Sequence, residues 1–144
     1  MYKIYCFLIF CATVISADLI SSSKGASLKP ISACCDIPEL ADPKPLAECS
    51  VPKLPGPCSD VQCIFQHSGF LIDDRTLNKD AYREHLYKWS QNNIAWTAAV
   101  KRAISDCVDT DLRQYLDYPC RAYDVFTCTG IAMLKKCPKE FWKC

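Results

Sequence analysis

The sequence has few of the residues from which common catalytic sites are built. Among 144 residues there are two histidines, His67 and His85, and four glycines. No Asp adjoins either histidine, and the motifs Gly-x-Ser-x-Gly and His-Glu-x-x-His are both missing. We therefore predict that the protein is not an enzyme and has no catalytic residue.

One enzyme class, the phospholipases A2, also consists of small, cysteine-rich secreted chains, so its catalytic motifs are compared with this sequence. Its chemistry needs a His-Asp pair on a helix and a glycine-rich calcium loop. The acid-rich segment 71–80 lacks the glycine and the terminal glutamate of a calcium loop. We interpret Asp73 and Asp74 as part of a solvated turn.

An excess of charge of one sign is also missing. The chain has 17 Lys and Arg against 16 Asp and Glu, a net charge of +1. Nucleic acids and anionic membranes attract proteins with a surplus of positive charge, so neither is predicted as a partner. Paired Cys-x-x-Cys knuckles are absent as well, which argues against structural zinc. We expect no nucleic-acid partner, no metal and no cofactor.

A long apolar run occurs once, at residues 4–15. It is shorter than the roughly 20 residues of a membrane span and is followed by polar sequence. We therefore interpret residues 1–17 as a secretory signal peptide, with a membrane span as the alternative, and residues 18–144 as one domain. Without Cys6 and Cys11, ten of the twelve cysteines remain. An even number of cysteines in a small secreted chain indicates disulfides, which we expect at Cys34, Cys35, Cys49, Cys58, Cys63, Cys107, Cys120, Cys128, Cys137 and Cys144.

The first part of this domain, residues 18–57, has the composition of an irregular arm. Seven prolines lie between Pro30 and Pro57, and each lacks an amide donor and restricts the residue before it. A short helix is possible only at 42–49. A helical core at 58–137 and a tail at 138–144 follow.

Residues 58–137 show helical periodicity and almost no strand signals. Val61, Ile64 and Phe65 share one helix face, for example, and Pro138 ends the last helix. We expect helices near 58–69, 78–90, 94–109 and 119–136. The predicted fold class is all-α: a compact, disulfide-stapled bundle of about four to six helices behind a Pro/Cys-rich arm.

Helix geometry limits how the cysteines can pair. Cys128 and Cys137 are nine residues apart and so lie on opposite faces of a helix, which requires different partners. Cys120 and Cys128 are separated by about 12 Å of helix rise, beyond the reach of one disulfide. The adjacent Cys34 and Cys35 are expected to reach two different elements, because a bridge between neighbours is strained.

The run CIFQHSGFLIDDRTLNKDAYREHLYKW, followed by AISDC and by CTGIAMLKKCP, resembles the insect odorant-binding protein family (PBP/GOBP-like). The extra cysteines Cys34, Cys35 and Cys120 and the ending CPKEFW are similar to its cysteine-enriched Plus-C branch. The resemblance covers the chain from Ala33 to the end.

This resemblance implies that six core cysteines pair first with third, second with fifth and fourth with sixth around an apolar cavity. The implied bridges are Cys35 (or Cys34) to Cys63, Cys58 to Cys128, and Cys107 to Cys137. The chain departs from the family because four residues, not three, separate Cys58 from Cys63. We expect Cys58 to lie just before the helix that carries Cys63.

Four cysteines remain: Cys49, Cys120, Cys144 and one of the Cys34/Cys35 pair. Cys120 lies about 25 Å of helix from Cys137, and the seven steps from Cys137 to Cys144 span about 23 Å when fully extended. A bridge between Cys120 and Cys144 is therefore barely within reach. We expect Cys144 to bond to the arm and Cys120 to another cysteine of the arm.

Large apolar side chains recur on the predicted helix faces. Singly each fits a core, but together they suit a cavity wall, because aromatic and Met side chains give wide, adaptable apolar surfaces. His67 and His85 are expected to be exposed or half-buried with partners, the alternative being a pH-dependent release of ligand. The predicted ligand-binding residues are Phe65, Leu86, Trp89, Trp96, Val100, Phe126 and Met133, together with Phe141 and Trp142, which either cover core or close the mouth of the cavity.

The resemblance implies a function as well as a fold. The protein is expected to be a secreted, extracellular carrier, a monomer or weak dimer, that binds small hydrophobic odorants, pheromones or similar ligands non-covalently. It would transport them to chemosensory receptors, so a membrane chemoreceptor is its second expected partner. The alternative is a secreted, disulfide-rich interaction protein of a venom, seminal fluid or defence system, without a ligand cavity.

Overall fold

The computed structural model describes residues 26–29, 33–50 and 57–144. The predicted signal peptide, residues 1–17, lies outside the described residues. None of the helices in the described ranges combines the length and apolar character that a bilayer span requires.

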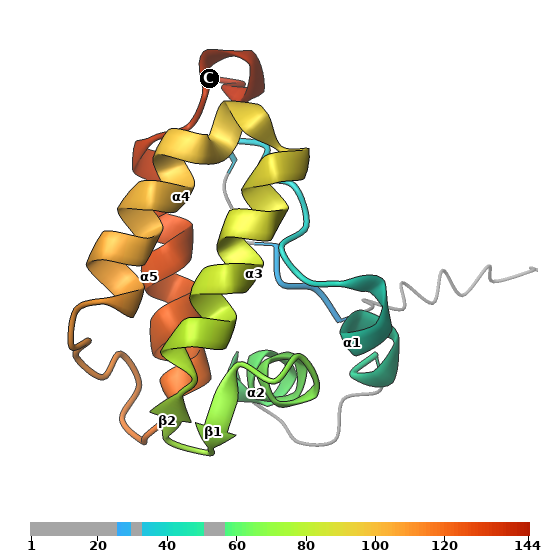
Figure 1. Ribbon diagram of the computed structural model, residues 1–144, viewed down its shortest axis with the longest axis vertical. Helices are drawn as coiled ribbons and strands as arrows, with labels where there is room; N and C mark the ends of the chain where they lie inside the picture. Colours follow the sequence, from blue (N-terminus) through green and yellow to red (C-terminus); the bar gives the residue numbers. More distant parts are fainter. Residues whose placement is uncertain (1–25, 30–32, 51–56) are drawn as a thin grey trace, which may run out of the picture.

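The described chain is mostly helical, as the sequence predicts. Three helices, α3 (Lys79–Asn92), α4 (Thr97–Ala103) and α5 (Arg121–Lys135), pack side by side (Figure 1). Helix α2 (Pro57–His67) lies across the end of the bundle where α3 and α5 begin, and the short α1 (Pro43–Glu48) packs against α2 (Figure 1). The bundle thus has a starting end, next to α2, and an opposite end, next to the carboxyl-terminal tail.

The helix boundaries follow from local chemistry. Helix α2 ends before Gly69, whose φ of 74° is accessible to glycine at little cost. Helix α3 begins after Asn78, whose side chain accepts a hydrogen bond from the backbone N–H of Ala81 at 3.2 Å. The expected helix 94–109 is divided into a 3-10 turn (Ile94–Trp96), α4 and a π-helical turn (Ile104–Val108).

A two-stranded hairpin between α2 and α3 was not expected from the sequence. Strand β1 (Leu71–Asp73) pairs with β2 (Thr76–Leu77), and Asp73 accepts the backbone N–H of Arg75 at 2.8 Å. This hydrogen bond is the main reason why the pKa of Asp73 is lowered. The solvated turn predicted at Asp73 and Asp74 is confirmed.

All ten cysteines of the described residues are bonded. The bridges are Cys34–Cys144, Cys35–Cys137, Cys49–Cys63, Cys58–Cys120 and Cys107–Cys128. Cys34–Cys144 joins the arm to the tail, Cys35–Cys137 joins the arm to the residue just before the tail, and the other three join neighbouring helical elements. A framework of this density is typical of proteins that fold in an oxidising compartment.

The three bridges implied by the family resemblance are wrong. Helix α2 packs against the start of α5, so Cys58, in the first turn of α2, meets Cys120 and not Cys128. Cys128 lies eight residues further along, about 12 Å of helix rise, where it faces Cys107. Cys63 bonds to Cys49 of the arm instead of Cys34 or Cys35. The expectation that Cys58 precedes the helix is also wrong.

Several expectations drawn from helix geometry are confirmed. Cys128 and Cys137 have different partners, and Cys144 bonds to the arm, as predicted. Cys120 does not bond to the arm, because its partner lies in α2. Cys34 and Cys35 do not bond to each other; Cys34 reaches the end of the tail at Cys144, and Cys35 reaches Cys137, two residues after the end of α5.

Candidate functional site

Eight of the nine predicted ligand-binding residues belong to one apolar core. Five are buried, three are half-buried at its margin, and Trp142 is 50% exposed and lies outside the core. The buried five are Phe65, Leu86, Trp96, Val100 and Met133, and the half-buried three are Trp89, Phe126 and Phe141. Within the described residues the structure does not show the internal cavity that the sequence analysis expects around them.

At the starting end of the bundle the aromatic side chains pack tightly on one another. Phe65 lies 5.5 Å from Phe70 and 5.2 Å from Tyr82 between ring centroids. The hydroxyl of Tyr82 donates to Thr129 Oγ1 at 3.2 Å, and burial raises the pKa of Tyr82 to about 12. This region has the packing and the satisfied polar groups of a core.

At the opposite end, Trp89, Trp96 and Phe141 form a second group, here called the tail-end cluster. Ring centroids lie 6.2 Å apart for Trp89 and Trp96, and 5.3 Å apart for Trp96 and Phe141. The indole N–H of Trp89 donates to the carbonyl of Glu39 at 2.8 Å. Trp96 is 0% exposed, and its indole N–H has no hydrogen-bond partner among the described residues.

The free N–H of Trp96 is unusual because buried polar groups are nearly always paired. Leaving such a donor without an acceptor costs about 1–3 kcal/mol. An acceptor atom that reached this N–H would recover part of that free energy, because the acceptor itself has to leave water. The tail-end cluster therefore offers an apolar aromatic surface with one unused hydrogen-bond donor.

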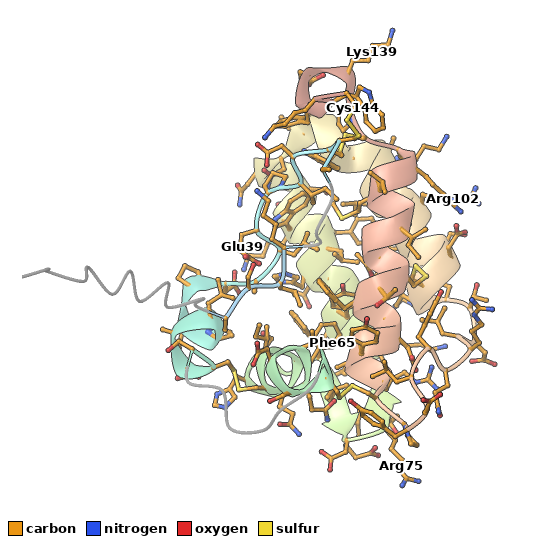
Figure 2. All side chains as sticks on the ribbon, turned by 180° about the vertical axis from the view of Figure 1, so that it is seen from behind. Glu39, Phe65, Arg75, Arg102, Lys139 and Cys144 are labelled. Carbon is orange, nitrogen blue, oxygen red and sulfur yellow. A yellow bond between two sulfur atoms is a disulfide. The ribbon has the colours of Figure 1, made fainter. Side chains whose placement is uncertain are left out.

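The tail that covers this cluster is fixed to the arm at several points. The backbone N–H of Asp36 donates to the carbonyl of Phe141 at 3.0 Å, and that of Lys143 donates to Cys34 at 2.8 Å. Hydrogen bonds from Lys29 at 2.7 Å and from Lys143 at 3.0 Å lower the pKa of Asp36. In Figure 2, Cys144 lies beside the arm at the end of the molecule beyond α5. Phe141 is thus held between two anchored cysteines, Cys137 and Cys144.

Both histidines have partners, as the sequence analysis expects. His67 is exposed, with Nδ1 at 2.6 Å from the carboxylate of Glu48. His85 is half-buried, and its Nε2 donates to the carbonyl of Leu40 at 2.6 Å. The alternative of a pH-dependent release of ligand stays a prediction.

Two further features bring polar groups together outside the tail-end cluster. His67 lies close to Cys49 and Cys63, but these cysteines are bonded to each other and offer no thiolate for a metal. A groove of about 320 Å³ between the end of α2 and α3 contains Trp89, His85 and the hydroxyl of Ser68, which has no hydrogen-bond partner in the described part of the chain. It is open to solvent and carries charged residues, so it suits a hydrophobic ligand less well than the tail-end cluster does.

Sequence reasoning missed Glu39, which organises the arm next to this cluster. Its Oε1 accepts the backbone N–H groups of Leu28, Leu40 and Ala41 at 2.8–3.1 Å, while its carbonyl holds Trp89. Figure 2 shows Glu39 on the arm beside the bundle. An acidic residue in a proline-rich segment gives no sequence signal of such a role.

Comparison with known proteins identifies no relative, because no family model, no curated protein and no solved structure matches the chain. The resemblance to odorant-binding proteins therefore remains a prediction from the sequence.

Proposed function

We propose that the protein is a secreted carrier that binds one small hydrophobic ligand non-covalently at the tail-end cluster, in the manner of insect odorant-binding proteins. The observation that carries this proposal is the buried, unpaired indole N–H of Trp96 among aromatic rings. The disulfide framework supports a secreted protein. Delivery to a membrane chemoreceptor is part of the same proposal.

The chemistry of the cluster defines the ligand class. Aromatic rings favour an apolar body, and the free N–H favours one hydrogen-bond acceptor, as in an ester, aldehyde or alcohol. Burying about 200 Å² of apolar ligand surface contributes about 5 kcal/mol. The hydrogen bond to Trp96 adds about 0.5–1.5 kcal/mol and selects ligands that carry an acceptor.

Entry of the ligand requires one side chain of the cluster to move, because the core is filled. Trp89 is fixed by α3 and by its hydrogen bond to Glu39. Phe141 lies in a short 3-10 turn (Lys139–Phe141) of the tail, outside the helical bundle. We therefore expect Phe141 to move aside when the ligand binds.

The test uses the fully oxidised, delipidated protein and a fluorescent apolar probe, displaced by octyl acetate or by decane. Octyl acetate is expected to bind more tightly, and Trp96→Phe should weaken it about 2- to 13-fold, the equivalent of 0.5–1.5 kcal/mol, while leaving decane unchanged. Trp89→Phe is the matched control, because it removes an indole of the same cluster whose N–H is already used. Equal affinities for both ligands in every variant would contradict the role of Trp96.

The alternative, an interaction protein without a ligand site, has its own support in the filled core and the exposed Trp142. The same measurement separates the two functions. If correctly oxidised protein takes up no probe and no ligand in a saturable manner, the carrier proposal is wrong and the alternative stands.

A further inference from the structure

A second groove lies at the starting end of the bundle, far from Trp96. It has a volume of about 260 Å³ and is formed by β2, the π-helical turn after α4, the segment 110–112 and the start of α5. Its apolar lining consists of Leu77, Cys107, Val108, Leu112 and Val125. Helix α5, of 15 residues and therefore about 22 Å long, separates the groove from the tail that covers Trp96.

Positive charge gathers on the rim of this groove. Arg75, Lys79 and Arg121 line it, against one carboxylate, Asp111. Arg75 lies at the tip of the hairpin, at the edge of the molecule (Figure 2). Because the whole chain has a net charge of only +1, this local excess is a property of the fold and not of the composition.

The neighbouring acids neutralise the rim only in part. Asp111 lies 3.9 Å from Lys79 and is fully exposed, so this pair is weak. Asp124 lies 3.6 Å from Arg121 and also accepts the backbone N–H of Tyr115 at 2.8 Å.

Two further acids lie near the groove without closing it. Asp109 is engaged by Arg83 at 2.6 Å. Asp73, on the same hairpin as Arg75, accepts the backbone N–H of that residue. The guanidinium of Arg75 has no hydrogen bond or ion pair with any described residue, and its attraction to Asp73 is the smallest of the interactions that lower the pKa of that carboxyl. It is therefore available to a ligand.

An apolar floor beneath a cationic rim is complementary to an anionic amphiphile. A carboxylate would pair with Arg75 and approach Lys79 and Arg121, while its hydrocarbon chain would lie on Leu77 and Leu112. Lys79 and Arg121 are also the first residues of α3 and α5, where the helix dipoles add positive potential. The small volume favours a short chain, because pockets for drug-sized ligands span roughly 300–1,000 Å³.

We propose that this groove binds a free, short- to medium-chain fatty-acid carboxylate, at a site separate from the tail-end cluster. The site does not depend on the proposed carrier function at Trp96. The occupant is a carboxylate with an apolar tail, because charge alone would accept any anion and apolar surface alone would accept any alkyl chain.

The test is a titration with octanoate, 1-octanol, acetate and inorganic phosphate, followed by backbone amide NMR shifts of the intact oxidised protein. Octanoate is expected to bind saturably and to shift amides of β2, 107–112 and the start of α5, while octanol, acetate and phosphate bind there at least about tenfold more weakly. Arg75→Glu should weaken octanoate about tenfold or more. The control Lys101→Glu makes the same change of net charge on α4, outside the groove, and should leave octanoate binding unchanged.

Each other outcome overturns the proposal. Phosphate binding as tightly as octanoate would show a general anion site. Octanoate shifts confined to the tail-end cluster, and abolished by Trp96→Phe but not by Arg75→Glu, would place the ligand in the carrier site instead. Binding to anionic phospholipid vesicles without binding of free octanoate would show a membrane surface. The octyl acetate measurement tests Trp96 separately, and its result does not depend on any of these three outcomes of the octanoate titration.

Discussion

The paired tethers of the tail provide a quantitative test of the disulfide framework. Cys34–Cys144 closes a sequence separation of 110 residues, and Cys35–Cys137 closes 102. Taken alone, a loop of about 110 residues would restrict the unfolded chain by about 4.8 kcal/mol at 25 °C. The two bridges are adjacent, however, so the presence of one shortens the loop that the other closes.

With Cys35–Cys137 in place, the bridge Cys34–Cys144 closes a ring of only about ten residues. The same entropy relation then gives about 2.7 kcal/mol. The double replacement of Cys34 and Cys144 by Ser is therefore expected to lower the free energy of unfolding by about 2.7 kcal/mol, not 4.8 kcal/mol. Both cysteines lie near the molecular surface, so the serines add little penalty of their own.

Removing both tethers should cost more than the sum of the two single effects. The remaining three bridges leave a path of about 40 residues between Cys35 and Cys137, for which the relation gives about 3.9 kcal/mol. The total loss is then about 6.6 kcal/mol, about 1.2 kcal/mol above twice the single value. Each single value, about 2.7 kcal/mol, is the loss of stability when one tether is removed and the other is still present.

Urea unfolding followed by far-ultraviolet circular dichroism measures these values. The single removal of Cys34–Cys144 should lower the midpoint by about 1–2 M. A loss near 5 kcal/mol, or none, would refute the reasoning, because it would mean that the two bridges do not share one loop. Mass spectrometry under non-reducing conditions must show the other four bridges intact in the variant.

Three further predictions concern single residues. Asn78→Ala should lower the free energy of unfolding by about 1 kcal/mol in a thermal melt, because it removes the cap of α3; an unchanged melting temperature would contradict the cap. The raised pKa of Tyr82, about 12, means that stability is fully present below pH 10 and is lost as the pH rises toward 12, since unfolding releases the phenol to ionise; absorbance at 295 nm during alkaline titration should show this tyrosine ionising last, and Tyr82→Phe should remove the late step. Phe141→Ala should cost about 1–3 kcal/mol in urea unfolding, because Phe141 packs on Trp96, whereas Trp142→Ala should cost less than about 1 kcal/mol; equal losses would place both side chains in the core.

The helices could be predicted because their signals are local. Asn78 caps α3 and Gly69 closes α2, and each acts on residues within one turn of itself. The irregular backbone of the arm at 33–42 could likewise be predicted from its prolines. Burial of Phe65, Leu86 and Trp96 follows from the same helical periodicity, so the core was identified together with the helices.

The pairing of the cysteines could not be read in this way, because it depends on how separate helices cross. Helix rise excluded a bond between Cys120 and Cys128, and that exclusion is correct. It did not reveal that α2 lies against the start of α5, which is what brings Cys58 to Cys120. The cationic groove has the same origin, since Arg75 and Arg121 are 46 residues apart in the sequence and meet only through the fold.

The tail connects the stability of the protein with its proposed function. In the proposed carrier, Phe141 would have to move for a ligand to reach Trp96, yet its segment is closed at both ends by Cys137 and Cys144. A ring of about ten residues can rearrange without unfolding the helices, but it cannot swing away as a free terminus would. Under the proposed carrier function, the tethers would limit the size of an incoming ligand more than its affinity, because affinity would depend on the aromatic surface and on the N–H of Trp96. A carrier built in this way would hold small ligands under a closed tail and would exclude bulky ones.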